Sequence, residues 1–292
     1  MDVVFHIGAH FTDRELLIKT LRRNREPLAE LGVAVPDPAA YRRPLGEAVA
    51  RLRGAAPDAE TAHMFRDLMG ITDTTRRVIL SNESFISMAS KAVEDGQFYP
   101  KAFKAGWLRA LFPETTVAFA LGLRDPAGLL AALYKKRAQD SQDFPDFLGG
   151  LTPTDPLWSD YVTRLRSAAP DAPILIWCNE DTPLIWPDII RRIGGLAPGA
   201  PVAGALDVAA QVLSKEGKKR LASFLVEHPP ATASAHRRVL AAFLDKYAEP
   251  EAMEDEIDLP GWTENDVENV AAAYDADVER IRSIRGVDVL LP

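Results

Sequence analysis

The stretch that decides the fold is "VVFHIGAHFTDRELLIKTL", residues 3–21. An apolar, β-branched run ends in a glycine turn, and a segment with leucines at helical spacing follows. A strand, turn and helix in this order direct backbone N–H groups at whatever lies over the start of the helix, where the helix dipole favours an anion. The stretch therefore predicts an anion-binding loop, and Asp13 is predicted to cap a helix over residues 14–31 despite Pro27.

The side chains of the turn oppose this function. Phe11 stands where an anion-binding loop favours a cation, while Asp13 and Glu15 add carboxylates. At an effective dielectric constant of ~20, each close contact between like charges costs on the order of a few kcal/mol. The turn is therefore either a working anion site, in which a cation from elsewhere in the chain replaces the missing one, or a loop that keeps the shape of such a site without binding the anion.

Further apolar runs predict the rest of the sheet. Continuous apolar runs separated by long helical stretches are typical of buried parallel strands with helices on both faces. We expect an α/β fold with a P-loop-like parallel sheet of four to five strands flanked by helices. The predicted strands are "VVFHI" (3–7), "RVILSN" (77–82), "TTVAFALGLR" (115–124), "PILIWC" (173–178) and, more weakly, "VDVLL" (287–291).

The chain changes character near residue 200. We expect an α/β core over residues 1–200 and a helical C-terminal portion over residues 201–292, packed on the core as one structural domain. Its predicted helices cover residues 207–228, 233–247 and 263–284.

Composition excludes several classes of function. The chain has 292 residues, of which 47% are hydrophobic, and a formal net charge of −8, so a broad basic surface for nucleic acid is not expected. No run approaches the ~18 apolar residues that cross a bilayer, and no secretory signal is recognisable, so we expect no membrane contact and a cytoplasmic location. Cys178 is the single cysteine and lies in an apolar run, which predicts a buried thiol and no internal disulfide.

At this point the order of motifs resembles a known family. "HIGAHFTDRELL" (6–17) is similar to the HIGxHKTGTTxL loop that opens bacterial sulfotransferases, which use 3′-phosphoadenosine 5′-phosphosulfate (PAPS). The resemblance extends from residue 1 to about residue 196. Its further segments are "NREPLAELGVAVP" (24–36), "VILSNESF" (78–85), "LGLRDPAGLLAALY" (121–134) and "IWCNEDTPLIWPDIIRRIGGL" (176–196).

The resemblance implies roles for particular residues. It implies that Glu83 is the candidate general base and that Arg124 holds the 3′-phosphate of the cofactor. The candidate cofactor-binding residues of the loop are Gly8, His10, Thr12 and Arg14. From position alone, Glu83 could equally be a helix cap or a loop hydrogen-bonder, and Arg124 could pair with Asp125 or Glu83.

The chain departs from the family where the cofactor would bind. The family's loop lysine is Phe11 here, its glycine is Asp13, and its two threonines are Arg14 and Glu15. A serine expected eight residues beyond the 3′-phosphate arginine is Ala132. The sequence thus predicts a degenerate cofactor loop, although Arg14 could replace the missing lysine.

Other chemistry finds little support. His6 lies at the end of a predicted strand and His10 in the loop that follows, so the two do not share a helical face. No second cluster of histidines or cysteines accompanies them, and no metal site is expected. No Gly-x-Ser-x-Gly turn surrounds Ser81 or Ser84, which argues against a serine hydrolase.

Three functions follow as hypotheses. The leading one is a sulfotransferase-like protein with a degenerate phosphosulfate loop, which is non-catalytic or re-purposed to bind a small anionic ligand or a protein partner and needs no cofactor. The alternative is an active PAPS-dependent sulfotransferase that acts on a hydroxyl or amine acceptor, with Glu83 as base. The third is a structural or assembly protein whose loop cavity Phe11 fills. The sequence leaves open whether the chain is an enzyme.

Overall fold

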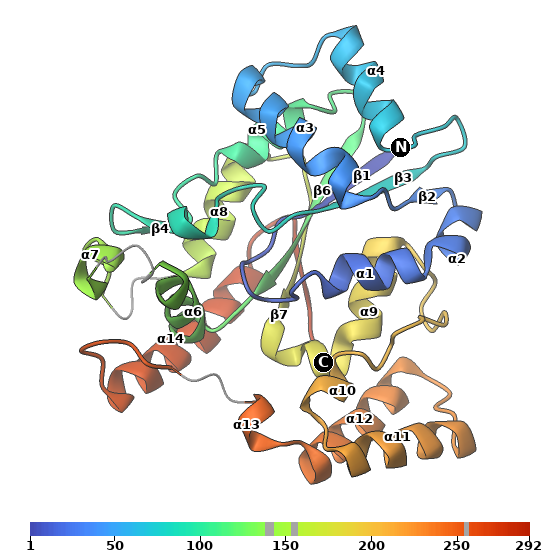
Figure 1. Ribbon diagram of the computed structural model, residues 1–292, viewed down its shortest axis with the longest axis vertical. Coiled ribbons are helices and arrows are strands. Elements are labelled where there is room, and N and C mark those ends of the chain that lie inside the picture. The colour runs from blue at the N-terminus through green and yellow to red at the C-terminus, as the bar shows by residue number, and fades with distance from the viewer. Residues whose placement is uncertain (138–142, 153–156, 254–256) are drawn as a thin grey trace.

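The centre of the molecule is a parallel sheet of six strands in the order β2-β3-β1-β6-β7-β8 (Figure 1). The computed structural model describes residues 1–137, 143–152, 157–253 and 257–292. The strands are β1 (Asp2–His6), β2 (Val33–Ala34), β3 (Arg77–Ser81), β6 (Thr116–Leu123), β7 (Ile174–Cys178) and β8 (Val287–Leu290). Every neighbouring pair is parallel. The α/β class is confirmed, and the sheet has one strand more than expected because β2, with two residues, is too short to form an apolar run.

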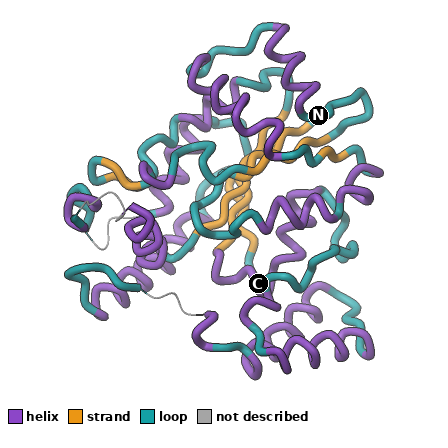
Figure 2. The backbone as a smooth tube through the Cα atoms, viewed as in Figure 1, coloured by secondary structure: helices purple, strands orange, loops and turns teal. Residues whose placement is uncertain are grey.

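Helices cover both faces of this sheet (Figure 2). Because side chains alternate along a strand, Val3 and Phe5 of β1 face one helical layer and Val4 faces the other. The helices are α1 (Leu16–Arg23), α2 (Arg25–Glu30), α3 (Pro38–Leu52), α4 (Ala59–Leu68), α5 (Lys104–Ala110), α6 (Pro126–Arg137), α7 (Phe144–Leu148), α8 (Trp158–Ala168), α9 (Thr182–Gly194), α10 (Ala209–Val212), α11 (Lys215–Glu227), α12 (Ala233–Tyr247), α13 (Pro250–Met253) and α14 (Glu264–Arg282). A small antiparallel hairpin, β4 (Val93–Glu94) with β5 (Gln97–Phe98), lies outside the sheet.

The first helical segment differs from the prediction. The single helix expected over residues 14–31 is two helices, α1 and α2, which meet at Asn24. The Asn24 side chain donates to the carbonyls of Thr20 and Ala203, which fixes the break. Pro27 then lies in the first turn of α2, where a missing N–H leaves no helical hydrogen bond unmade.

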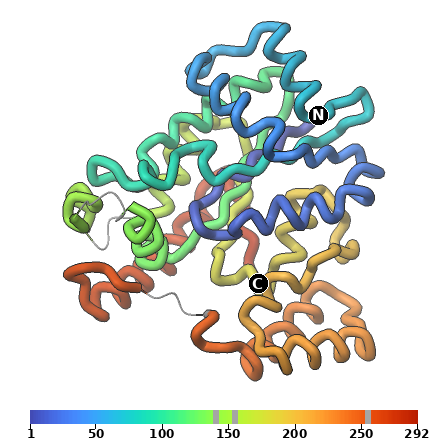
Figure 3. Tube along the Cα trace, in the orientation of Figure 1, coloured from blue at the N-terminus to red at the C-terminus, as the bar shows by residue number. Residues whose placement is uncertain are grey.

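The C-terminal portion combines a helical unit with a return to the sheet. Helices α11 and α12 pack on each other and, through Leu213, Leu221 and Leu240, form a small core beside α9 and α10. The chain then returns through α14, which packs on α8 and α6, and ends with β8 beside β7 (Figure 3). The helical character of this region is confirmed, while a boundary at residue 200 stays a prediction. No helix among the described residues is long and apolar enough to cross a membrane.

The strand order fixes where a ligand could bind. β1 lies between β3 and β6. After β1, the chain adds β2 and β3 on one side of it, and only then β6, β7 and β8 on the other side. In open α/β sheets, ligands bind outside the carboxyl ends of the strands at such a switch point. The loops that follow β1, β3, β6 and β7 therefore surround the candidate site.

Candidate functional site

The loop after β1, residues 7–15, is tied to the neighbouring strand. The Gly8 carbonyl accepts the N–H of Gly122, and the Ala9 N–H donates to the Gly122 carbonyl, both at 2.8 Å. Gly8 has φ +105°, a conformation that side chains rarely adopt, and a Cβ there would lie 3.3 Å from the backbone nitrogen of His10. Glycine is thus required at this position. We call residues 7–15 the glycine loop.

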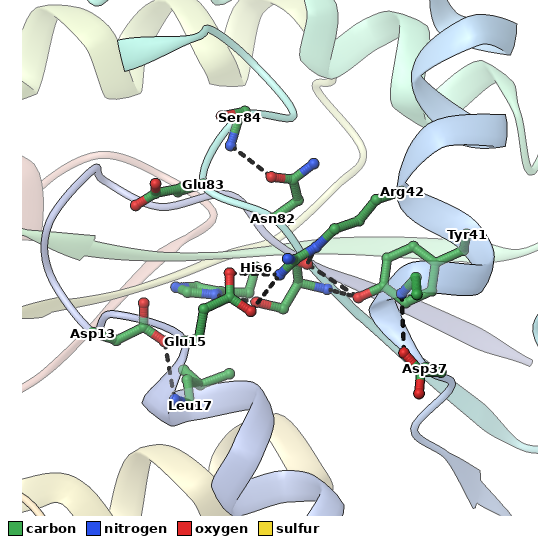
Figure 4. Close-up of polar contacts among 12 residues, drawn as sticks. His6, Asp13, Glu15, Leu17, Asp37, Tyr41, Arg42, Asn82, Glu83 and Ser84 are labelled. Atoms are coloured by element: carbon green, nitrogen blue, oxygen red, sulfur yellow. Dashed lines mark hydrogen bonds and ion pairs between the residues drawn. The ribbon is translucent and has the colours of Figure 1, made fainter.

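Two carboxylates accept backbone N–H groups in the glycine loop and at the start of α1, and Figure 4 draws the one between Asp13 and Leu17. Oδ2 of Asp13 accepts the N–H of Leu17, in the first turn of α1, at 2.9 Å. Oε2 of Glu83, just beyond β3, accepts the N–H of Phe11 at 3.3 Å. Asp13 therefore holds an N–H of the first turn as predicted, although the helix begins at Leu16 and its N-cap residue is Glu15. Two side chains of the protein thus occupy positions where a bound anion would accept hydrogen bonds.

Glu15 joins the glycine loop to α3. Nη2 of Arg42 lies 3.0 Å from both carboxylate oxygens of Glu15, and Nε of Arg42 donates to the Ser81 carbonyl at 2.9 Å. The hydroxyl of Tyr41, which is fully buried, donates to the same carbonyl at 3.0 Å and accepts the Ser81 N–H at 2.8 Å. The second acid of the loop is therefore neutralised by an arginine that is itself fixed to the end of β3.

The two histidines form structural contacts. Nδ1 of His6 shares a hydrogen bond with the Ser81 hydroxyl at 2.9 Å, and its ring stacks on Trp177. Nδ1 of His10 lies 2.7 Å from the Tyr99 hydroxyl, which also accepts the His10 backbone N–H. Burial, followed by the charge of Lys136, lowers the pKa of His10 to about 4, so its imidazole is neutral at neutral pH. The described residues include no group of three or more His, Cys, Asp or Glu that could hold a metal ion.

Phe11 and Glu83 lie near one lysine. The half-buried ring of Phe11 packs against the main core, and Nζ of Lys136, on α6, lies 5.6 Å from its centroid. Glu83 is half-buried, and burial raises the pKa of its carboxyl, although the Phe11 N–H and Lys136 act in the opposite direction. A carboxyl with a raised pKa at a strand end is a candidate proton acceptor.

Arg124 braces the glycine loop. It is 8% exposed, and its Nη1 donates to the Phe11 carbonyl at 3.2 Å. Its own carbonyl accepts the indole N–H of Trp158 at 2.9 Å. The guanidinium is therefore directed at the glycine loop. This agrees with the position of Arg124 just beyond the carboxyl end of β6, next to the end of β1.

A cleft of about 540 Å³ opens beside the glycine loop. The loop contributes Phe11, Thr12, Asp13 and Arg14, and Leu16 and Arg124 adjoin them. The opposite wall comes from the start of α9 and from α10. Of the residues predicted from sequence, Thr12, Arg14 and Arg124 line this cleft. Gly8, His10 and Glu83 lie elsewhere around the loop and do not line it.

Sequence reasoning missed the residues that complete the site. These are Tyr41, Arg42, Tyr99 and Lys136, and each contacts a loop or strand residue far away in the chain. No motif marks them, because the register of β1 against β3 and the packing of α3 and α6 bring them into place.

Comparison with known proteins adds one structural likeness. No family model and no curated protein matches the chain. The crystal structure of a sulfotransferase from Alicyclobacillus acidocaldarius is similar, with 12% sequence identity and a TM-score of 0.39 over 86% of this chain and 97% of that chain. With a TM-score this low, we draw no conclusion about activity or ligands from the likeness.

Proposed function

We propose that the chain is a sulfotransferase-like protein whose glycine loop no longer binds the phosphosulfate group of PAPS. We propose further that it binds another ligand and does not transfer a sulfuryl group. The observation that carries this proposal is the hydrogen bond from the Leu17 N–H to Asp13. The start of α1 is the place where a phosphate would bind, and a carboxylate of the chain already accepts a hydrogen bond there.

The charges around the loop oppose a dianion. A phosphosulfate placed over the loop would meet Asp13 and Glu83, whose carboxylates lie on two sides of it. Two like charges 4 Å apart repel by about 4 kcal/mol at an effective dielectric constant of 20. One such contact alone weakens binding about a thousandfold, since each 1.4 kcal/mol is a factor of ten.

The cations that the structure places around the loop are already engaged: Lys136 lies over the Phe11 ring and close to Glu83, and Arg124 donates to the Phe11 carbonyl. The position of the family's lysine holds Phe11, and Arg42 is engaged with Glu15 and the Ser81 carbonyl. Arg14 is exposed and lines the cleft. Sulfuryl transfer depends on electrostatic stabilisation of the charge that develops on the bridging oxygen. The loop supplies no group for that task.

One observation favours the alternative, an active PAPS-dependent sulfotransferase. Glu83 combines half-burial with a raised pKa at the carboxyl end of β3, which suits a general base. In that case the carboxylate would release the Phe11 N–H when cofactor binds, and Arg124 would turn to the 3′-phosphate.

Calorimetric titration with 3′-phosphoadenosine 5′-phosphate tests the proposal. The wild-type protein is expected to give no binding heat and no thermal stabilisation at millimolar nucleotide. The double variant Asp13→Asn, Glu83→Gln, which removes two charges and keeps the side-chain shapes, is expected to bind more tightly than wild type.

Two results would overturn the proposal. The first is micromolar binding by the wild-type protein that is lost in Arg124→Ala. The second is sulfuryl transfer from PAPS to a hydroxyl or amine acceptor that is lost in Glu83→Gln, which would establish the alternative.

A further inference from the structure

The cleft beside the glycine loop has two kinds of wall. Its volume of about 540 Å³ suits a small organic molecule. The loop side carries charged groups. The opposite side combines the apolar side chains of Pro183, Trp186, Val208 and Val212 with the polar ones of Asn179, Glu180, Thr182 and Gln211.

Most polar groups of the cleft already have partners within the protein. Asp13 accepts the Leu17 N–H, and Glu180 accepts the Asp125 N–H at 2.8 Å and the Tyr274 hydroxyl at 3.2 Å. The hydroxyls of the two lining threonines donate to backbone carbonyls three residues earlier. The carboxylates and hydroxyls of the wall are thus directed at the protein.

Arg14 is different. Its side chain is exposed, lines the cleft, and makes no hydrogen bond or ion pair with any residue that the structure describes. Arg124, which is 8% exposed, lines the same cleft while it holds the Phe11 carbonyl. The thirteen-residue helix α9 begins at the cleft with Thr182 and Pro183, and the residue before it, Asp181, provides no side-chain cap. Two arginines and the positive end of a helix dipole therefore favour an anion here.

The number of charges limits that anion. Among the described residues that line the cleft, the two arginines are matched by the two carboxylates of Asp13 and Glu180. A ligand with one negative charge can pair with the guanidinium of Arg14. A second charge would lie near the carboxylates of Asp13 and Glu180, and Arg124, the other cation of the described lining, already donates to the Phe11 carbonyl.

We infer that this cleft binds a small organic monoanion, in which one carboxylate or sulfonate group sits on an apolar body. The anionic group pairs with Arg14 near the start of α9, and the apolar body packs on Pro183 and Val212, which are partly exposed in the cleft. The inference rests on the proposed function, because it takes the glycine loop to be closed to dianions.

Three probes that share one aromatic ring test the charge requirement. They are benzyl alcohol, benzenesulfonate and phenyl phosphate, which are neutral, singly charged and doubly charged at pH 8. Titrations followed by protein NMR are expected to give the lowest Kd for benzenesulfonate and shifts confined to the cleft residues.

A matched pair of variants tests the role of Arg14. Arg14→Gln is expected to weaken benzenesulfonate binding at least tenfold and to leave benzyl alcohol unchanged. Lys19→Gln removes the same charge from an exposed residue of α1 outside the cleft and is expected to change binding less than twofold.

The possible failures can be told apart. Equal weakening by Arg14→Gln and Lys19→Gln, or a Kd for phenyl phosphate below that for benzenesulfonate, overturns the inference. If one of these results is found while the titration with 3′-phosphoadenosine 5′-phosphate gives no heat, the inference fails and the proposed function stands. If the nucleotide binds at micromolar concentration, the proposed function itself fails.

Discussion

Replacing Asp13 by alanine is expected to destabilise the protein through the start of α1. Oδ2 of Asp13 accepts the Leu17 N–H at 2.9 Å, and the N-cap residue, Glu15, makes no side-chain hydrogen bond to this helix. Loss of such a cap costs about 1 kcal/mol, and loss of a negative charge at a helix N-terminus costs about 0.5 kcal/mol more. Asp13→Ala should therefore lower the free energy of unfolding by about 1.5 kcal/mol and the Tm by about 3–6 °C.

Asp13→Asn separates the hydrogen bond from the charge. Asparagine retains an acceptor oxygen, so only the charge contribution of about 0.5 kcal/mol should disappear, and 1 M salt should shrink this difference. Asp275→Ala, at an exposed position in the middle of α14, is the control and should change stability by less than about 0.5 kcal/mol.

Urea unfolding of the four proteins measures these differences. The reasoning is refuted if Asp13→Ala is as stable as the Asp275→Ala control. It is also refuted if Asp13→Asn loses as much stability as Asp13→Ala, because the acceptor oxygen would then contribute nothing.

Two further predictions concern the surroundings of the loop. Tyr41→Phe leaves the buried Ser81 N–H without its acceptor and should lower the free energy of unfolding by about 1–3 kcal/mol in urea, whereas an unchanged midpoint would contradict the assigned bond. His10 has a folded-state pKa of about 4, below the ordinary 6.5 of a histidine side chain, so the unfolded chain binds more protons between these pH values. Stability should therefore fall as pH drops from about 6.5 toward 4, and His10→Gln should flatten this slope; parallel pH profiles for both proteins would contradict it.

The sequence predicted the sheet better than it predicted the site. Strands β1, β3, β6 and β7 are buried on both faces, so each leaves a continuous apolar run that can be recognised without its neighbours. The site depends instead on which residues of different strands and helices meet. The pairing of His6 with Ser81 follows from the register of β1 and β3, and the contact of Glu15 with Arg42 follows from the packing of α3. Neither leaves a local pattern.

The carboxylates of the glycine loop have a structural consequence that their charge alone does not suggest. Phe11, Arg14 and Glu15 have φ of 60°, 46° and 68°, which costs roughly 1–2 kcal/mol each for residues with a side chain. In a loop that binds a phosphate, the ligand can offset such a cost when it accepts the loop's hydrogen bonds.

Here the hydrogen bonds to Asp13 and Glu83 and the ion pair between Glu15 and Arg42 offset that cost without a ligand. The same groups that oppose a dianion therefore hold the loop in shape when it is empty. It follows that the double variant Asp13→Asn, Glu83→Gln should bind 3′-phosphoadenosine 5′-phosphate more tightly and have a lower free energy of unfolding than the wild-type protein. A variant that gained affinity and stability together would show that the carboxylates are not what keeps the empty loop in place.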